Sequence, residues 1–158
     1  MNFIYKFVDV SDKKNCDKIE KFLLNINNDY PVPLTNKISF HDFILKISNN
    51  GLIIGAFLDD AIVGGIFFYA NNFSDKIAFL TLIGVQKEYR CMGIANNLLI
   101  EMKNYCQKKS FSRIQLYTHK ENKIARRFYE QRNFYEIESD RTDSLKLELK
   151  LEEFLWIY

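Results

Sequence analysis

The sequence has few of the residues that build metal sites and disulfide frameworks. It contains three cysteines, an odd number, and no Cys-x-x-Cys pair. The two histidines, His41 and His119, lie far apart in the chain and have no cysteine at the spacing of a zinc site. The sequence therefore predicts neither a disulfide-stabilised fold nor a metal centre.

Long apolar runs are also missing. No stretch approaches the roughly 18 consecutive apolar residues of a membrane span. The N-terminal segment MNFIYKFVDVSDKK lacks the apolar core and the small-residue cleavage site of a signal peptide. With unpaired cysteines, these features predict a cytoplasmic protein in a reducing compartment, without a membrane partner.

Prolines are also few, and the net charge is small. There are two prolines, and the formal net charge is only +2, with no long basic stripe, so no nucleic-acid partner is expected. Hydrophobic residues make up 47% of the 158 residues, enough for a sizeable core. We expect a single domain over residues 1–158.

Hydrophobic periodicity predicts an alternation of strands and helices. Alternating or β-branched runs predict strands at Phe3–Val10, Leu52–Leu58, Ala61–Ala70, Ile77–Val85, Arg113–Thr118, Phe134–Glu138 and Leu145–Leu151. Helical spacing predicts helices from Ser11 or Asp12 toward Asn27, and over Ser39–Ile47, Gly93–Lys109 and Asn122–Arg132. The short connections between residues 52 and 85 predict an antiparallel meander. The order indicates an α/β (α+β) fold, a mixed sheet with helices on its faces.

The stretch QKEYRCMGIANNLL places Gly93 where a strand gives way to a helix. The first amides of a helix have no internal partner, and the helix dipole makes that end a site for anions such as phosphate. Gly93 lets the backbone approach such a ligand, Ala95 keeps the next turn thin, and Arg90 and Lys87 add positive charge. By itself, this stretch is more simply explained by an ordinary strand–turn–helix connection with a glycine in the turn.

A second stretch, ENKIARRFYEQRNFYEI, favours the phosphate-binding interpretation of the first. With it, the chain resembles the GNAT N-acetyltransferase superfamily in its order of elements and in two motifs. The first motif, R/Q-x-x-G-x-G/A, is matched by Arg90, Gly93 and Ala95. The second, N-x-x-A-x-x-x-Y followed by Gly-Phe, is matched by Asn122, Ala125, Tyr129 and Phe134, with Asn133 in place of the glycine. Asparagine tolerates the left-handed conformation better than most residues.

The resemblance implies a sheet of about seven mostly antiparallel strands, with helices on both faces. It implies that acetyl-CoA binds where the fourth and fifth strands, Ile77–Val85 and Arg113–Thr118, splay apart. The pantetheine arm would pair with the backbone of Ile83, Gly84 and Val85. The pyrophosphate would bind the amides of Arg90, Cys91, Met92, Gly93, Ile94 and Ala95.

The resemblance also assigns two roles near the reacting atoms. Tyr129 would lie beside the sulfur as the proton donor, and Asn122 would contact pantetheine or the acceptor. No acetyl-enzyme is implied at Cys91. The fourth strand contains no carboxylate to deprotonate the amine, which leaves His119 or a water chain to a distant carboxylate as alternatives.

The acceptor is expected to contact the early loop, Asn27–Phe40, and the last hairpin, Ser139–Ser144. Candidate contacts are Tyr30, Phe40, Thr81 and His119, and Asp29 and Asp42 for a cation. The leading hypothesis is acetyl transfer from acetyl-CoA to the primary amine of a small molecule. The alternatives are acetylation of a protein N-terminus or lysine, and a non-catalytic acyl-CoA-binding module. A homodimer is left open, and the aromatic tail EEFLWIY is expected to cover an edge or meet a partner.

Overall fold

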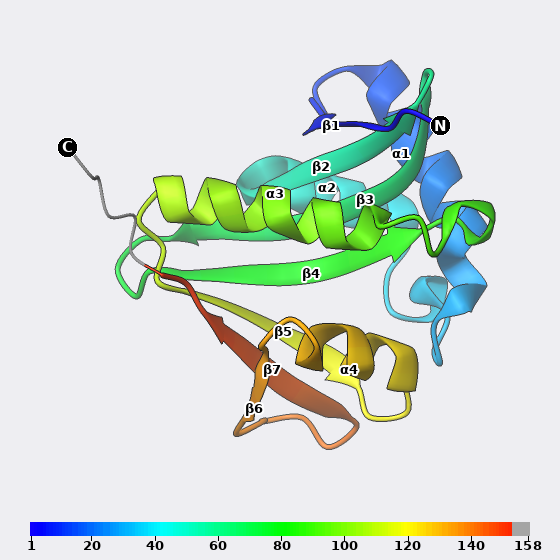
Figure 1. Cartoon of the computed structure of the whole chain (residues 1–158). Coiled ribbons are helices and arrows are strands. Elements are labelled where there is room, and N and C mark those ends of the chain that lie inside the picture. Colours follow the sequence, from blue (N-terminus) through cyan, green and yellow to red (C-terminus); the bar gives the residue numbers. More distant parts are fainter. Residues whose placement is uncertain (153–158) are drawn as a thin grey trace.

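A computed structural model describes residues 1–152, in which seven strands form one mixed sheet. The strand order is β1-β2-β3-β4-β5-β7-β6, and Figure 1 shows the strands beside the helices. The strands are β1 (Ile4–Phe7), β2 (Gly51–Leu58), β3 (Ala61–Asn72), β4 (Ile77–Val85), β5 (Arg113–His119), β6 (Tyr135–Ile137) and β7 (Ser144–Lys150). Only β4 and β5 pair in parallel, so the prediction of a mostly antiparallel sheet is confirmed. Most of the aromatic tail lies outside the described residues.

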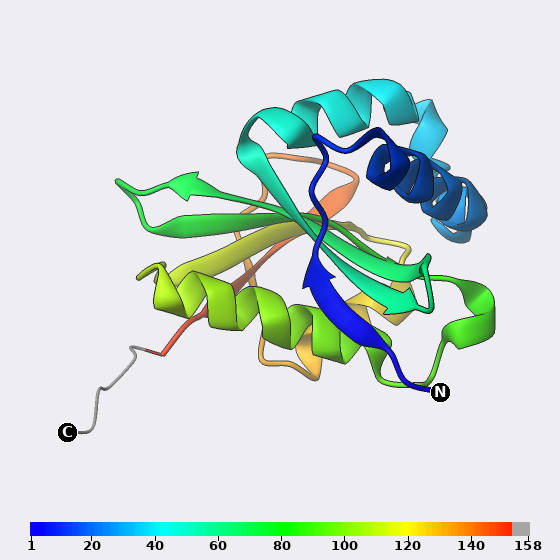
Figure 2. The ribbon, with the colours of Figure 1, turned by 90° about the horizontal axis from the view of Figure 1, so that it is seen from above.

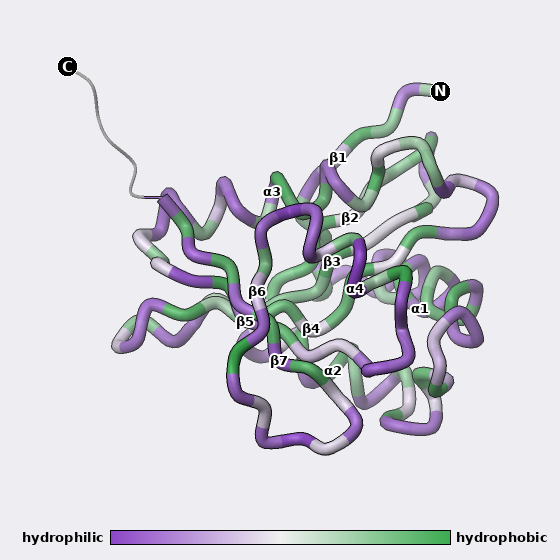
Figure 3. Tube along the Cα trace, turned by 60° about the horizontal axis from the view of Figure 1, so that its bottom comes forward, coloured by the Kyte–Doolittle hydropathy of each residue, from purple (hydrophilic) through white to green (hydrophobic). Residues whose placement is uncertain are grey.

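Four helices cover the two faces of this sheet, as predicted. They are α1 (Lys13–Ile26), α2 (Phe40–Asn50), α3 (Ile94–Lys108) and α4 (Lys123–Glu130). Figure 2 shows α1 and α2 on one face and α3 on the other. Each layer has its own buried apolar cluster, one with α1 and α2 and the other with α3 and α4. Apolar residues concentrate in the central strands and polar residues in the peripheral loops (Figure 3).

Element boundaries differ from the predicted ones by a few residues. Asp12, not Ser11, caps α1, because its carboxylate accepts the amide of Lys14 (2.9 Å). The first strand ends at Phe7, three residues early, and α2 continues three polar residues beyond Ile47. Apolar spacing marks the buried part of an element, whereas polar residues can complete its last turn.

β4 contains a bulge at the point where β4 and β5 separate. Leu82 pairs with Phe67 and Leu80 with Phe68, which leaves Thr81 as an extra residue without a partner on β3. Leu80 therefore packs in the cluster with α3, and Leu82 in the cluster with α1 and α2. In a regular strand, residues two apart share one face.

The parallel pairing of β4 with β5 ends at the same place. It covers only Ile77–Leu80 of β4, opposite Arg113–Leu116 of β5. Beyond it, β4 continues for five residues and β5 for three, and the two strands diverge (Figure 1). The splay between the fourth and fifth strands is thus confirmed.

Gly84, in the diverging part of β4, lies where there is no room for a side chain. An added Cβ would lie 2.7 Å from Cδ1 of Ile26 and 2.9 Å from the hydroxyl of Tyr30. We expect Gly84→Ala to lower the free energy of unfolding by about 1–3 kcal/mol, because both side chains must shift. Urea denaturation measures this loss. In an Ile26→Val background, which lacks the Cδ1 atom nearest the new Cβ, the same substitution should cost less, so an equal loss in both backgrounds would contradict the crowding argument.

Candidate active site

The edge of β4 beyond the bulge carries backbone groups that the sheet does not use. The amide of Gln86 donates to the carbonyl of Val63 on β3 (2.8 Å). Because successive residues of a strand turn their backbone groups to opposite sides, Ile83 and Val85 face away from β3. β5 no longer pairs with β4 there. The N–H and C=O groups of Ile83 and Val85 therefore face the opening between the two strands.

Side chains cover the two carbonyls of this edge. The hydroxyl of Tyr30 donates to the carbonyl of Ile83 (2.8 Å), and Nε of Arg90 donates to the carbonyl of Val85 (3.0 Å). These bonds support the strand orientation derived above. They leave the N–H groups of Ile83 and Val85 as the donors of the open edge, where an extended ligand can pair as an added strand would.

Arg90 acts here through contacts within the protein. Its guanidinium also pairs with the carboxylate of Asp29, in the short 3-10 helix Asn27–Asp29 that follows α1. The sequence suggested that its charge would help to bind phosphate. In the structure, the side chain links the loop before α3 to the early loop, Asn27–Phe40. The amide of Arg90 donates to the carbonyl of Lys87 (3.4 Å), and the binding of pyrophosphate by Arg90 stays a prediction from the sequence.

The loop before α3 exposes its amides. Cys91 (φ 61°) and Gly93 (φ 80°) both adopt the left-handed conformation, a backbone pattern that turns amides toward an anion. Gly93 precedes the first residue of α3 and provides no side-chain cap. A Cβ added there would meet no described atom within 4 Å. The space around the first amides of α3 is therefore open to a ligand.

The predicted phosphate-binding residues divide into exposed and buried ones. Cys91, Met92 and Gly93 are exposed, Ala95 is half-buried, and the side chain of Ile94 is buried in the core. Ile94 can therefore offer a ligand its backbone amide but not its side chain. The thiol of Cys91 has no histidine beside it in the sequence and is a free thiol.

A cavity of about 490 Å³ lies next to the open edge of β4. It brings together Tyr30, Phe40, Thr81 and His119, which the sequence nominated as acceptor contacts. The early loop and the last hairpin both contribute to its wall, as predicted. The carboxylates of Asp29 and Asp42 do not line it, so the suggestion that they attract a cation is not supported, and Asp29 is engaged by Arg90.

Tyr129 of α4 reaches the same cavity. Its side chain is 5% exposed, and its ring packs edge-on against Phe134 (5.2 Å between centroids). Burial raises the pKa of Tyr129 far above its usual value, and the neighbouring Tyr30 raises it further, so the hydroxyl stays protonated. Within residues 1–152 this hydroxyl has no hydrogen-bond partner, which leaves it free to donate to a ligand.

Two asparagines shape α4 around this tyrosine. Asn122 lines the cavity, and its side-chain carbonyl caps the helix by accepting the amide of Ala125 (3.1 Å). Asn133, which replaces the motif's glycine, has φ 69°. It adopts the left-handed conformation that the substitution by asparagine predicted, so the turn into Phe134 is preserved.

The cavity offers no evident base for the amine. Among residues 1–152 no aspartate or glutamate lines it. Nδ1 of His119 accepts the amide of Glu121 (3.2 Å), which in the neutral imidazole leaves the proton on Nε2. In this arrangement His119 presents a hydrogen-bond donor rather than a lone pair.

The sequence matches the Acetyltransferase (GNAT) family over residues 19–134, most of the chain. The chain belongs to the GNAT acetyltransferase family. The match spans α1 through the second motif, including the open edge of β4 and the loop before α3. The predicted family and fold are therefore confirmed, and acetyl-CoA is the acyl donor that this family membership supports.

Individual GNAT relatives are similar to different extents. Spermidine N(1)-acetyltransferase of Thermoplasma acidophilum is 30% identical over 92 residues, which are 58% of this chain and 55% of that protein. The matched segment thus spans about half of that relative. The crystal structure of PaiA N-acetyltransferase from the same organism, in complex with coenzyme A, has a TM-score of 0.76 at 18% identity and covers 95% of this chain and 99% of that one. A putative GNAT acetyltransferase from Desulfovibrio desulfuricans has a TM-score of 0.80 at 14% identity. The match covers 96% of this chain and 100% of that one.

Three basic residues around the GNAT cavity were not nominated from the sequence. Lys37, Lys46 and Arg141 lie on the early loop, on α2 and on the β6–β7 loop, and all three line the cavity. All three are exposed, and Arg141 lies far along the chain from the two lysines. An isolated exposed lysine or arginine carries no sequence signal, so only the fold brings this set together.

We expect Gly93→Asn to remove most of the thermal stabilisation that acetyl-CoA provides. Asparagine tolerates φ 80°, so the variant should fold, but its side chain enters the space beside the first amides of α3. Saturating ligand, at about 100 times its Kd, should stabilise the parent by roughly 2.7 kcal/mol. The measurement is the change in Tm between ligand-free and millimolar acetyl-CoA samples.

Cys91→Gly is the matched control for this loop. Glycine accepts the left-handed conformation without strain, so this variant should be as stable as the parent or up to about 1 kcal/mol more stable. It should keep the full response to acetyl-CoA, because the loop contributes its backbone. A parental response in Gly93→Asn, or a lost response in Cys91→Gly, would contradict this assignment.

Proposed function

We propose that this protein transfers the acetyl group of acetyl-CoA to the primary amine of a small molecule by direct attack on the thioester. The observation that carries the proposal is the open edge of β4, which lies between the exposed amides before α3 and the cavity. A donor held along this edge would present its thioester to an acceptor bound in the cavity. Residues 1–158 as one acetyltransferase domain, a cytoplasmic location and a homodimer stay predictions from the sequence.

The residues present fit acetyl-CoA in two places. The N–H groups of Ile83 and Val85 suit the amide carbonyls of pantetheine, and Gly84 between them leaves that stretch of strand thin. The amides from Cys91 to Ala95 suit the pyrophosphate, supported by the dipole of α3. Asn122 still has its side-chain NH₂ group to donate toward pantetheine or the acceptor.

The chemical step needs little more than placement and hydrogen bonds. The amine nitrogen forms a bond to the carbonyl carbon, the carbon–sulfur bond breaks, the amine gives one proton to water, and the thiolate leaves. Holding two substrates in reactive geometry supplies much of the rate. The N–H of Val85 is a candidate donor to the carbonyl oxygen as it gains negative charge.

Tyr129 is the candidate donor to the departing sulfur. A thiol has a pKa of about 8.5, and burial raises the pKa of Tyr129 well above that of ordinary tyrosine. Full proton transfer to the thiolate is therefore uphill. Tyr129 is best suited to stabilise the developing thiolate by a hydrogen bond, with the final proton supplied by solvent.

The alternatives differ in the cavity they require. A protein acceptor needs an open groove for the chain that flanks the target amine. The cavity here has walls from the early loop, α2 and the β6–β7 loop, which favours a small acceptor. A non-catalytic acyl-CoA-binding module does not require Tyr129 at the cavity. A thermal-shift screen with acetyl-CoA, longer acyl-CoAs and a panel of amines separates the three.

We expect Tyr129→Phe to lower kcat by about 10²-fold, the lower end for the loss of one hydrogen-bond donor to a developing negative charge, with little change in acetyl-CoA affinity. The ring and its packing against Phe134 remain, and only the hydroxyl is lost. Steady-state kinetics and acetyl-CoA binding measure the two effects separately. A raised KM for acetyl-CoA at constant kcat would instead assign Tyr129 to cofactor positioning.

Tyr135→Phe is the matched control for this substitution. The hydroxyl of Tyr135 donates to Glu148 (2.6 Å) at the edge strand β6, and Tyr135 does not line the cavity. Its loss should leave kcat within about twofold of the parent. Equal losses in both variants would point to a general effect on the fold.

A further inference from the structure

The charged residues that line the cavity are all basic. Lys37, Lys46 and Arg141 contribute their side chains from three separate segments, and His119 adds a hydrogen-bond donor. Within residues 1–152, no carboxylate lines this cavity, and none of the three cations forms an ion pair within 4 Å. The walls between them are apolar or tyrosine-rich.

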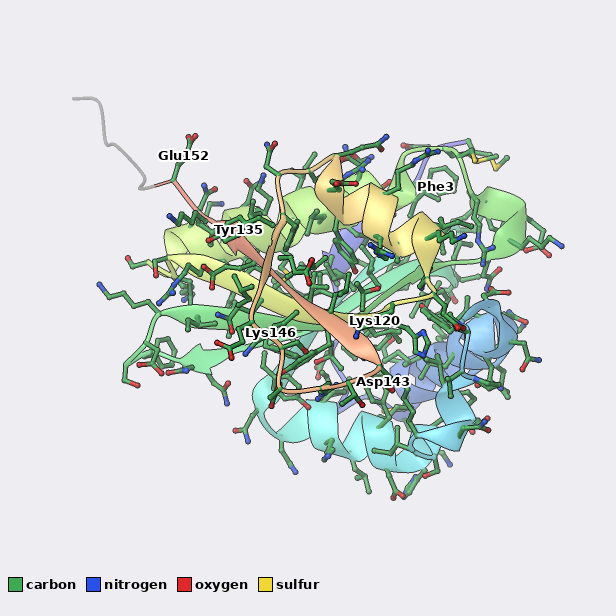
Figure 4. The ribbon with its side chains drawn as sticks, turned by 90° about the horizontal axis from the view of Figure 1, so that it is seen from below. Phe3, Lys120, Tyr135, Asp143, Lys146 and Glu152 are labelled. Atoms are coloured by element: carbon green, nitrogen blue, oxygen red, sulfur yellow. The ribbon has the colours of Figure 1, made fainter. Side chains whose placement is uncertain are left out.

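Three carboxylates lie outside the lining of the cavity, and two of them feel its cations. Hydrogen bonds lower the pKa of Asp140 and of Asp143, and the charges of Arg141 and of Lys37, respectively, lower them further. Asp29 pairs with Arg90. Asp140 accepts the hydroxyl of Tyr117, and Asp143 accepts the hydroxyl of Ser144 (3.0 Å). Figure 4 shows Asp143 beside Lys120 at the start of β7, where its carbonyl accepts the amide of Lys120 (3.0 Å).

Arg141 is held in place at the rim. Its guanidinium lies 3.7 Å from the centre of the Tyr117 ring, a stacked geometry that keeps its hydrogen-bond donors available. Tyr117 itself lines the cavity. The arginine is therefore a positioned cation with its planar donor group free for a carboxylate or a phosphate.

We propose that the acceptor is a small primary amine that also carries a carboxylate or phosphate group. This inference rests on the acetyltransferase function proposed above and names its substrate class. The anionic group binds among Lys37, Lys46 and Arg141, and the amine points toward the open edge of β4. A polyamine such as spermidine, on which the relative from Thermoplasma acidophilum acts by its name, meets charge of its own sign here.

These three basic residues also affect the protonation state of the acceptor amine. A positive charge near an ammonium group favours loss of its proton. The basic rim thus favours the neutral, nucleophilic amine in a cavity that has no carboxylate to act as base. One feature accounts for both the recognition of an anion and the activation of the amine.

The experiment compares acetyl-CoA turnover for matched pairs of amines, followed by release of the CoA thiol. The pairs are 4-aminobutyrate against its primary amide, which lacks the carboxylate, and an amino sugar against its phosphate ester, with spermidine as the polycation. We expect kcat/KM to be at least tenfold higher for the anionic member of at least one pair, and that pair identifies carboxylate or phosphate. Higher kcat/KM for spermidine or for the neutral members would overturn the inference and leave the acetyltransferase function intact.

Charge-reversal variants test the residues themselves. Lys46→Glu and Arg141→Glu should each lower kcat/KM for the anionic amine at least tenfold and leave the KM for acetyl-CoA unchanged. Lys14→Glu, the same charge change at the exposed start of α1, should have no effect on either. Equal losses of kcat/KM in all three variants would contradict a specific role of the cavity's basic residues in binding the anionic group. If acetyl-CoA binds but no amine is acetylated, the proposed function fails and the inference fails with it.

Discussion

The unpaired edge of β4 is the constraint on which the rest of this structure depends. A buried backbone group needs a hydrogen-bond partner, and the bulge at Thr81 ends the pairing that β5 would otherwise provide. The protein satisfies the carbonyls of Ile83 and Val85 with its own side chains and leaves their amides facing the opening. A strand edge with only donors available is selective for a ligand that brings carbonyl oxygens.

The two side chains that cover those carbonyls also join the two halves of the site. Tyr30 and Asp29 are neighbours just after α1, and they contact β4 and Arg90 respectively. Through them, the loop that forms one wall of the cavity is fastened to the edge proposed for the acyl donor. The position of the early loop thus depends on the same strand edge that we propose for the acyl donor. In the reaction that we propose, the basic residues of the rim favour the neutral amine, and water accepts its proton.

Hydrophobic periodicity and the two motifs were enough to predict the elements, their order and the family. The left-handed conformation of Asn133 also followed from residue type. The bulge did not, because Thr81 lies in an apolar run without glycine or proline to mark it. The pairing of Arg90 with Asp29 and the meeting of Lys37, Lys46 and Arg141 depend on contacts between distant segments, which no local pattern encodes.

Amide hydrogen exchange followed by NMR, with and without acetyl-CoA, tests the central claim most directly. The account predicts that acetyl-CoA slows exchange at Ile83, Val85 and the amides from Cys91 to Ala95. Gly84, which faces β3, should already exchange slowly and change little. Protection that spares Ile83 and Val85, or that falls on Gly84 to the same extent, would contradict the proposal that the open edge of β4 holds the acyl donor.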